Sequence, residues 1–419
     1  MKIAICGMIK SPNLGDKFIA DSLAWIIKEE MKERGIREMP VFVFVDIMAT
    51  NDVTAEYSSQ IASCVHNLYD YSYWGIPNEY LYRALNKIAK SIKQPSLRNT
   101  VYKLKHVIWR HSQNFGKRHI KYFQKKFKDV DLIIIAGGGL LEYSYNEYQE
   151  SLNLITLYAE KHSIPVIVNA IGRAGKFDRN DYRCQVLMET FQRNCVKYVS
   201  ARDSRESVQE CVGKRLNVKL LADAAFCVSE AYNISANSEK KLIGIGLLRE
   251  TGPLSYTKNG YNKTKWIDLF CDIVKELSNR GYQWEFFTNG FESDYRFGLQ
   301  LVSKLGIPKE KLVERPVDET VLLKTISKYS GLITCRMHSS IAAFSLGIPS
   351  IILSWNDKVD KYMDIAGYPQ RAVKQDNFNS KYIVNLLEQA LKEGISVENR
   401  SRMKIKARES VKDYMDLII

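Results

Sequence analysis

Residues 331–358 read GLITCRMHSSIAAFSLGIPSIILSWNDK, and this stretch decides the fold. The apolar run Leu332–Cys335 predicts a buried strand, and the residues after Arg336 predict a helix that ends at the Gly-Ile-Pro turn 347–349. A second apolar run, Ser350–Leu353, follows at once. Strand, helix and strand in this order predict a parallel pair, and open parallel sheets bind their ligands at the carboxyl ends of the strands.

Two polar side chains, Arg336 and His338, follow the first of these strands. Because they lie two residues apart, an extended strand end would place them on one face. A guanidinium beside an imidazole at a helix amino terminus suits an anionic substrate that needs a proton transferred. The simpler alternative is that Arg336 pairs with a carboxylate and His338 caps the helix.

The composition predicts a globular protein with two domains. The chain has 419 residues, more than one hydrophobic core usually organises, and 45% are hydrophobic and 26% charged. The first seven residues predict a strand and not a signal peptide, and no apolar run is long enough to cross a bilayer. The eight cysteines show no C-x-x-C pair, so we expect a cytoplasmic protein with reduced thiols.

Strands and helices alternate along both halves, which predicts an α/β protein of two doubly wound, Rossmann-like domains facing a cleft. The first domain is expected over 1–232, with an insertion at about 51–130. The second is expected over 240–395 and carries the Arg-Met-His sequence; a short strand is expected within it at 311–314. A closing helix is expected in 396–419.

One segment carries all of the excess positive charge. The net charge is +14, and residues 80–128, the basic block, contain 14 Lys or Arg residues and no Asp or Glu. Aromatic residues gather at its start: Tyr69, Tyr71, Tyr73, Trp74, Tyr80 and Tyr82. Three interpretations are open: the block is only a solvated face, it binds an anionic membrane surface, or it binds nucleic acid. No nucleic-acid-binding module accompanies it, so we expect no nucleic-acid partner.

Cations follow other expected strands at their carboxyl ends. Arg202, Arg249 and Lys358 occupy such positions, as Arg336 does. Any one of them would suit a structural ion pair. Four cations at the same kind of edge predict an anionic small substrate.

Two loops in the N-terminal half complete the candidate site. Asn13, Gly15 and Asp16 lie between the first strand and the first helix, where phosphates and sugars bind in such folds, but the loop lacks the GxGxxG and GK[ST] motifs. Asp16 alone would also serve as a helix N-cap. The other loop contains three consecutive glycines, Gly137, Gly138 and Gly139. Because glycine has no side chain, they let the backbone approach a ligand or a neighbouring loop.

These segments together resemble the polysaccharide pyruvyl transferase family over essentially the whole chain. The matching pieces are 13–16, 131–139, 201–203, 223–226 and 336–358, of which the last is the most diagnostic. The resemblance implies a GT-B-like fold and the use of phosphoenolpyruvate to form a pyruvate ketal on a hexose of a surface glycan. The insertion at about 51–130 departs from shorter members of the family.

The resemblance also implies roles for individual residues. Arg336, Met337 and His338 fall on the donor-binding and catalytic motif, and Arg202 becomes a second donor ligand. We expect His338 and Arg336 to be catalytic, Arg249 and Lys358 to join the donor site, and the two loops to line the acceptor side. No metal or cofactor is expected, because no cluster of metal ligands appears in the sequence.

The residue types suit this chemistry. Phosphoenolpyruvate carries a carboxylate and a phosphate, and guanidinium groups bind both. Ketal formation needs a proton at the methylene carbon, after which two sugar hydroxyls attack in turn and phosphate leaves. An imidazole near neutral pKa gives a proton in one step and takes one in another.

Two other functions are weighed against this one. A GT-B glycosyltransferase that uses a nucleotide sugar often has a Glu five residues before the glycine of the Gly-x-Pro turn, where this chain has Ala342. A non-catalytic glycan- or membrane-binding protein would not need Arg336, His338 and Arg202 intact. The expected partners are phosphoenolpyruvate and a glycan or lipid-linked sugar in the cytoplasm, with peripheral binding at the inner face of the membrane as an open alternative.

Overall fold

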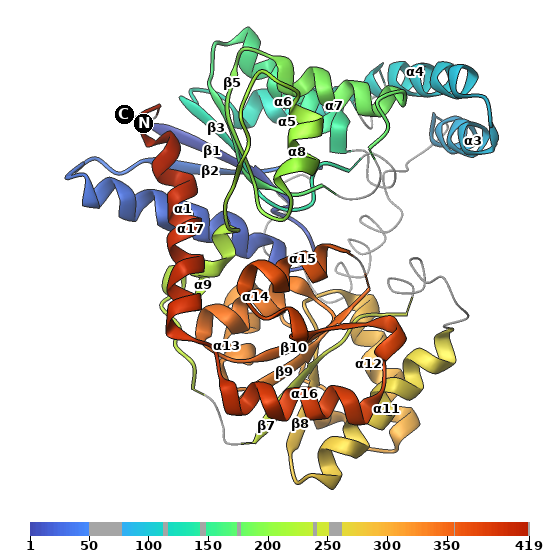
Figure 1. The fold of residues 1–419 in the computed structure, drawn as a ribbon. Helices are drawn as coiled ribbons and strands as arrows, with labels where there is room; N and C mark the ends of the chain where they lie inside the picture. The colour runs from blue at the N-terminus through green and yellow to red at the C-terminus, as the bar shows by residue number, and fades with distance from the viewer. Residues whose placement is uncertain are drawn as a thin grey trace. The chain divides into compact units, whose positions relative to one another are not determined.

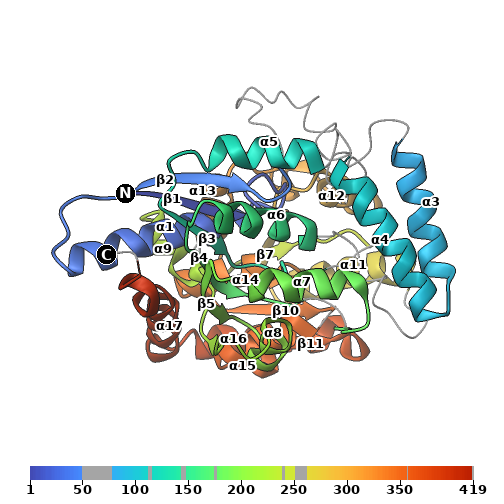
Figure 2. The same cartoon turned by 90° about the horizontal axis from the view of Figure 1, so that it is seen from above.

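The computed structural model describes residues 1–49, 78–111, 116–142, 148–173, 177–237, 241–250, 262–355 and 357–417. These residues form two compact units, each with a parallel sheet flanked by helices (Figures 1 and 2). The first unit comprises Met1–Ser11, Ile27–Asp223 and Glu409–Ile419, and the second comprises Pro12–Ile26 and Ala224–Arg408. Both units are therefore discontinuous in sequence.

The sheet of the first unit has six parallel strands in the order β2-β1-β3-β4-β5-β6. The strands are β1 (Lys2–Gly7), β2 (Val41–Asp46), β3 (Leu132–Ala136), β4 (Val166–Ile171), β5 (Val196–Ala201) and β6 (Lys219–Leu220). β3 and β4 are buried at every position, as expected of apolar strands covered on both faces. The strand order reverses between β1 and β3, the position at which open α/β sheets bind ligands.

Four helices pack over one face of this sheet, and the two outermost helices of the chain belong to both units. The four are α5 (Gly116–Lys126), α6 (Tyr148–Lys161), α7 (Tyr182–Gln192) and α8 (Arg205–Val212). Their apolar side chains form one core with Ile133, Ile135 and Val168 of the sheet. The division between the units falls inside α1 (Gly15–Glu33) and inside α17 (Val397–Met415).

The second unit has a five-stranded parallel sheet in the order β11-β10-β9-β7-β8. Its strands are β7 (Leu242–Gly246), β8 (Gln283–Phe287), β9 (Gly331–Thr334), β10 (Ser350–Ser354) and β11 (Ala372–Lys374). Its helices are α9 (Val228–Ala231), α11 (Lys263–Asn279), α12 (Glu292–Leu305), α13 (Glu319–Ser327), α14 (Met337–Leu346), α15 (Asp357–Ala366) and α16 (Ser380–Glu393). Asn262, Asp318 and Asn379 cap the amino ends of α11, α13 and α16 with their side chains.

The predicted α/β class with two parallel, Rossmann-like sheets is confirmed. The strand predicted at 311–314 is wrong, because only an isolated bridge joins Leu312 to Phe286. The domain boundaries 1–232, 240–395 and 396–419 stay predictions, as does the facing of the domains across a cleft. The two compact units differ from those boundaries, because residues 12–26 and 224–232 belong to the second unit and residues 409–419 to the first.

The basic block folds into helices. α3 (Asn78–Ser91) and α4 (Pro95–His111) form an antiparallel pair, and α5 follows. The predicted aromatic residues at 69–74 lie outside the described residues, as do the side chains of Tyr80 and Tyr82. In the part of the chain that the structure describes, no helix is both long enough and apolar enough to cross a membrane.

One of the basic residues points inward. Lys105 on α4 is only 3% exposed. Burial, and next the nearby Arg183 guanidinium, lower the pKa of Lys105 to about 7. An unfolded lysine has a pKa of about 10.4. Between these two values the unfolded chain binds more protons at this position than the folded chain, so Lys105 makes folding stability rise with pH.

We therefore expect Lys105→Met to raise the free energy of unfolding at pH 7 and to reduce its rise between pH 7 and about 10. Urea denaturation at pH 7 and pH 9 measures both effects. Lys87→Met removes an exposed lysine of α3 and serves as the control, with little expected change. A pH dependence in Lys105→Met that equals that of the wild type would contradict the prediction.

Candidate active site

Arg336 and His338 lie across the junction between β9 and α14. β9 ends at Thr334, and the backbone amide of Arg336 donates to the Thr334 hydroxyl over 3.1 Å. Arg336 is the last extended residue before the helix, and His338 is already the second residue of α14. The prediction that both stand on one extended strand end is therefore wrong, because the helix begins between them. Both still lie at the carboxyl end of a central strand of the sheet.

His338 contacts Asp16, a residue that precedes it by more than 300 positions. The His338 ring, 6% exposed, places its Nδ1 3.2 Å from Asp16 Oδ1. Asn13 Nδ2 donates to the same carboxylate oxygen over 3.0 Å. A carboxylate at Nδ1 holds the proton there and orients the ring, which leaves Nε2 as the nitrogen that can exchange a proton with a substrate.

Gly15 sits against the histidine. A Cβ atom at this position would lie 2.4 Å from the Cβ of His338, so only glycine allows the approach. The predicted loop residues Asn13, Gly15 and Asp16 are thus brought together with His338 in the second unit. Asp16 is the second residue of α1 and not its N-cap, and its side chain reaches the imidazole.

Asn289 fixes this loop from the other side, and the sequence analysis missed it. Its backbone carbonyl accepts from the Leu14 amide over 2.9 Å, and its side-chain oxygen accepts from Ser339 Oγ over 2.5 Å. Asn289 is fully buried. Gly290 beside it has φ of 107° and allows Pro12 to approach. The available signal was the Asn-Gly pair just after the apolar run of β8. Arg336 was singled out because it follows β9 in the same way.

Arg336 pairs with Asp294, a second residue that the sequence analysis missed. The Asp294 side chain, on the first turn of α12, is fully buried and accepts from Arg336 NH2. Asp294 Oδ1 also accepts from the backbone amide of Arg249 over 3.0 Å. Arg336 also lies over the Phe291 ring, 4.7 Å from its centroid. The carboxylate pairing left open by the sequence is present, and two of the predicted cations meet there.

Among the described residues, Asp294 alone accepts a hydrogen bond from the Arg336 guanidinium. No described residue accepts a hydrogen bond from its buried Nε atom. Its side chain is 16% exposed, and a fully buried carboxylate fixes its NH2 group. A guanidinium anchored in this way keeps donors in a set direction for a carboxylate or phosphate.

Arg202 lies in the first unit, after β5. Its NH1 donates to Asp223 over 2.5 Å, and its Nε lies 3.8 Å from Asp203 Oδ2. All three side chains are buried. Gly172 allows this arrangement, because a Cβ there would lie 2.5 Å from the Asp203 carboxylate. The predicted donor ligand is therefore a cation held between two carboxylates.

The glycine triplet follows β3 in the same unit. Gly137 and Gly138 have φ of 44° and 76°, which favours glycine at both positions. The Gly138 carbonyl accepts from the Gly172 amide over 2.7 Å. The sequence predicted that Gly137–Gly139 approach either a ligand or a neighbouring loop. These contacts show the approach to a neighbouring loop.

The end of β4 holds a residue that the sequence analysis did not single out. Asn169 is fully buried, and neither atom of its amide group hydrogen-bonds to a described residue. Ala170 next to it has φ of 49°, and the pairing with β5 shifts register there. Strained backbone and unsatisfied buried polar groups concentrate at functional sites. One asparagine near the carboxyl end of an apolar strand was the available signal.

The other two predicted donor residues lie at the amino ends of helices that follow strands of the second sheet. Met337 opens α14 and is half-buried, and Lys358 lies in the first turn of α15. Cys335, beside Arg336, is fully buried, and burial raises the pKa of its thiol, which excludes it as a ready nucleophile. Within the described ranges, no three His, Cys, Asp or Glu side chains form a group that could hold a metal ion.

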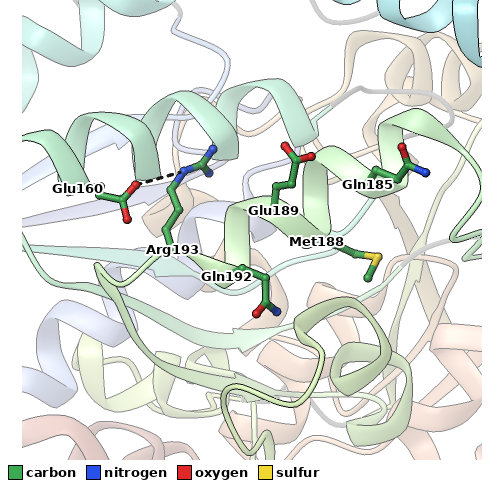
Figure 3. A pocket seen from close by; sticks show the side chains of 6 residues that line it. All are labelled: Glu160, Gln185, Met188, Glu189, Gln192 and Arg193. Carbon is green, nitrogen blue, oxygen red and sulfur yellow. Dashed lines mark ion pairs between the residues drawn. The ribbon is translucent and has the colours of Figure 1, made fainter.

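An open groove of about 560 Å³ in the first unit is lined by none of these residues (Figure 3). Its lining includes Glu160 and Arg193, which form an ion pair over 3.7 Å. Both stand at the ends of helices, α6 and α7, that run back from the carboxyl edge of the sheet. Its other lining residues follow α7 from Gln185 to Gln192, so the groove runs along this helix and not along the carboxyl ends of the strands, where α/β folds bind their ligands.

Comparison with known proteins places this chain in a family. The family model described as polysaccharide pyruvyl transferase matches residues 66–357, most of the chain. The chain belongs to the polysaccharide pyruvyl transferase family. The matched range includes Arg202, Arg336 and His338 but begins after Asp16. A search among curated protein sequences finds no match.

Similar solved structures establish the GT-B fold. The UDP-GlcNAc 2-epimerase of Neisseria meningitidis, bound to UDP-GlcNAc, aligns with TM-score 0.53 and 11% identity, over 99% of this chain and 100% of that one. The UDP-GlcNAc 2-epimerase of Methanocaldococcus jannaschii aligns with TM-score 0.51 and 12% identity, over 99% and 100%. At such identities the likeness concerns the fold alone, and the predicted GT-B-like architecture is confirmed.

We expect Gly15→Ala to destabilise the protein by about 1–3 kcal/mol, because the added methyl group overlaps His338 and forces a shift. Urea denaturation measures the loss. Gly7→Ala is the matched control, since its new Cβ would meet no atom closer than 3.4 Å. Equal stability of the two variants would show that the loop does not press on His338.

Proposed function

We propose that this member of the polysaccharide pyruvyl transferase family transfers pyruvate from phosphoenolpyruvate to two hydroxyls of a hexose on a surface glycan or its lipid-linked precursor. The observation that carries the proposal is His338 with Asp16 at its Nδ1, beside Arg336 fixed by Asp294. This arrangement joins a proton-transferring group to an anion-binding group at one end of one sheet, which is what the family's chemistry requires.

In the proposed reaction His338 Nε2 supplies a proton to the methylene carbon of phosphoenolpyruvate, which leaves a cationic carbon at C2. One sugar hydroxyl attacks C2, phosphate departs, and a second hydroxyl closes the ketal. The two hydroxyls release two protons, of which one balances the new methyl group and the other leaves with phosphate. The neutral imidazole left by the first step accepts a hydroxyl proton, so His338 ends the cycle as it began.

Arg336 would bind the carboxylate or phosphate of the donor through the edge that Asp294 leaves open. Asp294 and the Phe291 ring fix the guanidinium before the substrate arrives, so little conformational freedom is lost on binding. The backbone amide of Arg249 donates to the same Asp294 carboxylate. Arg202, between Asp203 and Asp223, is the corresponding candidate in the first unit.

The alternative is a GT-B enzyme that uses a nucleotide sugar. The observation in its favour is the likeness in fold to UDP-GlcNAc 2-epimerases. Isothermal titration with phosphoenolpyruvate and with UDP-sugars separates the two. Binding of phosphoenolpyruvate without measurable binding of a UDP-sugar is expected, and the reverse result would refute pyruvyl transfer.

Variants at the donor site should separate binding from turnover. His338→Ala should keep phosphoenolpyruvate binding in titration and lower phosphate release by about 10²–10⁴-fold. Arg336→Lys should keep the charge that Asp294 needs but lose the planar fork, and weaken binding by about tenfold or more. Arg336→Ala is less informative, because it would leave a buried carboxylate unpaired. Near-normal turnover in His338→Ala would remove His338 from the mechanism.

Asp16→Asn tests how the histidine is held. We expect turnover to fall by about tenfold or more, a smaller loss than in His338→Ala. The pH profile should also move to lower pH, because no carboxylate then favours the protonated ring. Glu29→Gln, which removes another α1 carboxylate, one paired with Lys32 at the surface, is the matched control. An unchanged pH profile in Asp16→Asn would mean that the Asp16 carboxylate does not influence the protonation of His338.

A further inference from the structure

α4 has an outer face that none of the proposed chemistry uses. Its inner face carries Tyr102, Lys105 and Trp109, all buried. At 100° per residue, Leu97, Leu104 and Val107 fall on the opposite side. Their exposed fractions are 53%, 51% and 51%, and no charged residue separates them along this stripe. α4 is therefore apolar on both faces, and the face that carries Leu97, Leu104 and Val107 is exposed.

α3 extends this surface. It packs on α4 through Leu85 and Ala89, which are buried, and both views show it beside α4 at the edge of the first unit (Figures 1 and 2). Ile88 of α3 is 47% exposed. Lys87, Lys90 and Lys93 are exposed on the same short helix and the turn after it. The pair thus combines exposed aliphatic side chains with exposed ammonium groups and contains no acidic residue after Glu79.

α5 provides an internal comparison. It belongs to the same basic block and exposes Lys117, Lys121 and Lys125. Its apolar residues, such as Phe123, pack into the core, and none of its large apolar side chains is exposed. α5 is therefore an ordinary helix with a solvated basic face, whereas α3 and α4 form a surface on which both aliphatic side chains and lysines are exposed.

We propose that the α3–α4 pair docks the protein onto an anionic membrane surface, with Leu97, Leu104 and Val107 entering the headgroup boundary and the lysines contacting anionic headgroups. Apolar side chains flanked by cations are what interfacial helices use. The choice of a membrane rests in part on the proposed function, because a lipid-linked acceptor is presented at such a surface.

The charges disfavour the other occupants. A second copy docked by the same face would bring lysines against lysines with no carboxylate between them. A nucleic acid would use the cations but has no need of exposed leucine and valine, since its backbone is bound by charge and its bases by stacking or hydrogen bonds.

Sedimentation with liposomes tests the proposal without any substrate, so its outcome is independent of pyruvyl transfer. The wild type should bind vesicles of phosphatidylglycerol and phosphatidylcholine, fail to bind pure phosphatidylcholine, and be released by high salt. Leu97→Gln/Leu104→Gln/Val107→Gln should weaken binding at least about tenfold, because the apolar contacts are lost. These side chains are exposed, so the fold should remain, as circular dichroism would verify.

Two charge variants decide which helices are responsible. Lys87→Gln/Lys90→Gln/Lys93→Gln should weaken vesicle binding by roughly 100-fold. Lys117→Gln/Lys121→Gln/Lys125→Gln removes the same charge from α5 and should have an effect of less than about threefold. Equal losses in the two variants, or no binding by the wild type, would overturn the proposal. So would a wild-type dimer in light scattering that the glutamine variants dissociate, since a second copy would then occupy the surface.

Discussion

The contact of Gly15 and Asp16, at the start of α1, with His338 is the constraint on which the site depends. The imidazole stands at the start of a helix in the middle of the second sheet, and the carboxylate that orients it comes from the start of the chain. The approach requires a residue without a side chain at position 15. Asn289 fixes the loop through its backbone and reaches α14 through its side chain, so one buried amide sets the position of both partners.

Two of the cations expected to bind an anionic substrate are paired with carboxylates of the protein. Arg336 is fixed by Asp294, and Arg202 by Asp223 with Asp203 nearby. An isolated buried cation is costly, so a partner carboxylate is needed to keep the side chain charged and in place. The same carboxylate reduces the attraction for a distant anion. Such a site selects ligands by the direction of its remaining donors more than by net charge.

The sequence was sufficient for the features that depend on local pattern. Apolar runs gave the parallel strands, and the Arg-Met-His stretch after one of them gave the edge at which the site lies. What it could not provide were the partners. Asp294 and Asn289 lie more than 40 residues before Arg336 and His338, and nothing in either segment encodes the contact. The strand predicted at 311–314 failed because pairing depends on the neighbouring strand, which the local sequence does not specify.

The exchange of segments between the two units sets the order in which the chain can fold during synthesis. Residues 12–26 leave the ribosome early, but the unit to which they belong is completed only when residues 224–408 have followed. The first unit in turn lacks its last helical segment until residues 409–419 emerge. Neither unit can therefore close until segments far apart in the sequence have both been synthesised, and contacts of such long sequence separation form slowly. Until then the apolar side chains of α1 lack the partners that they have in the folded protein, which favours aggregation of the nascent chain.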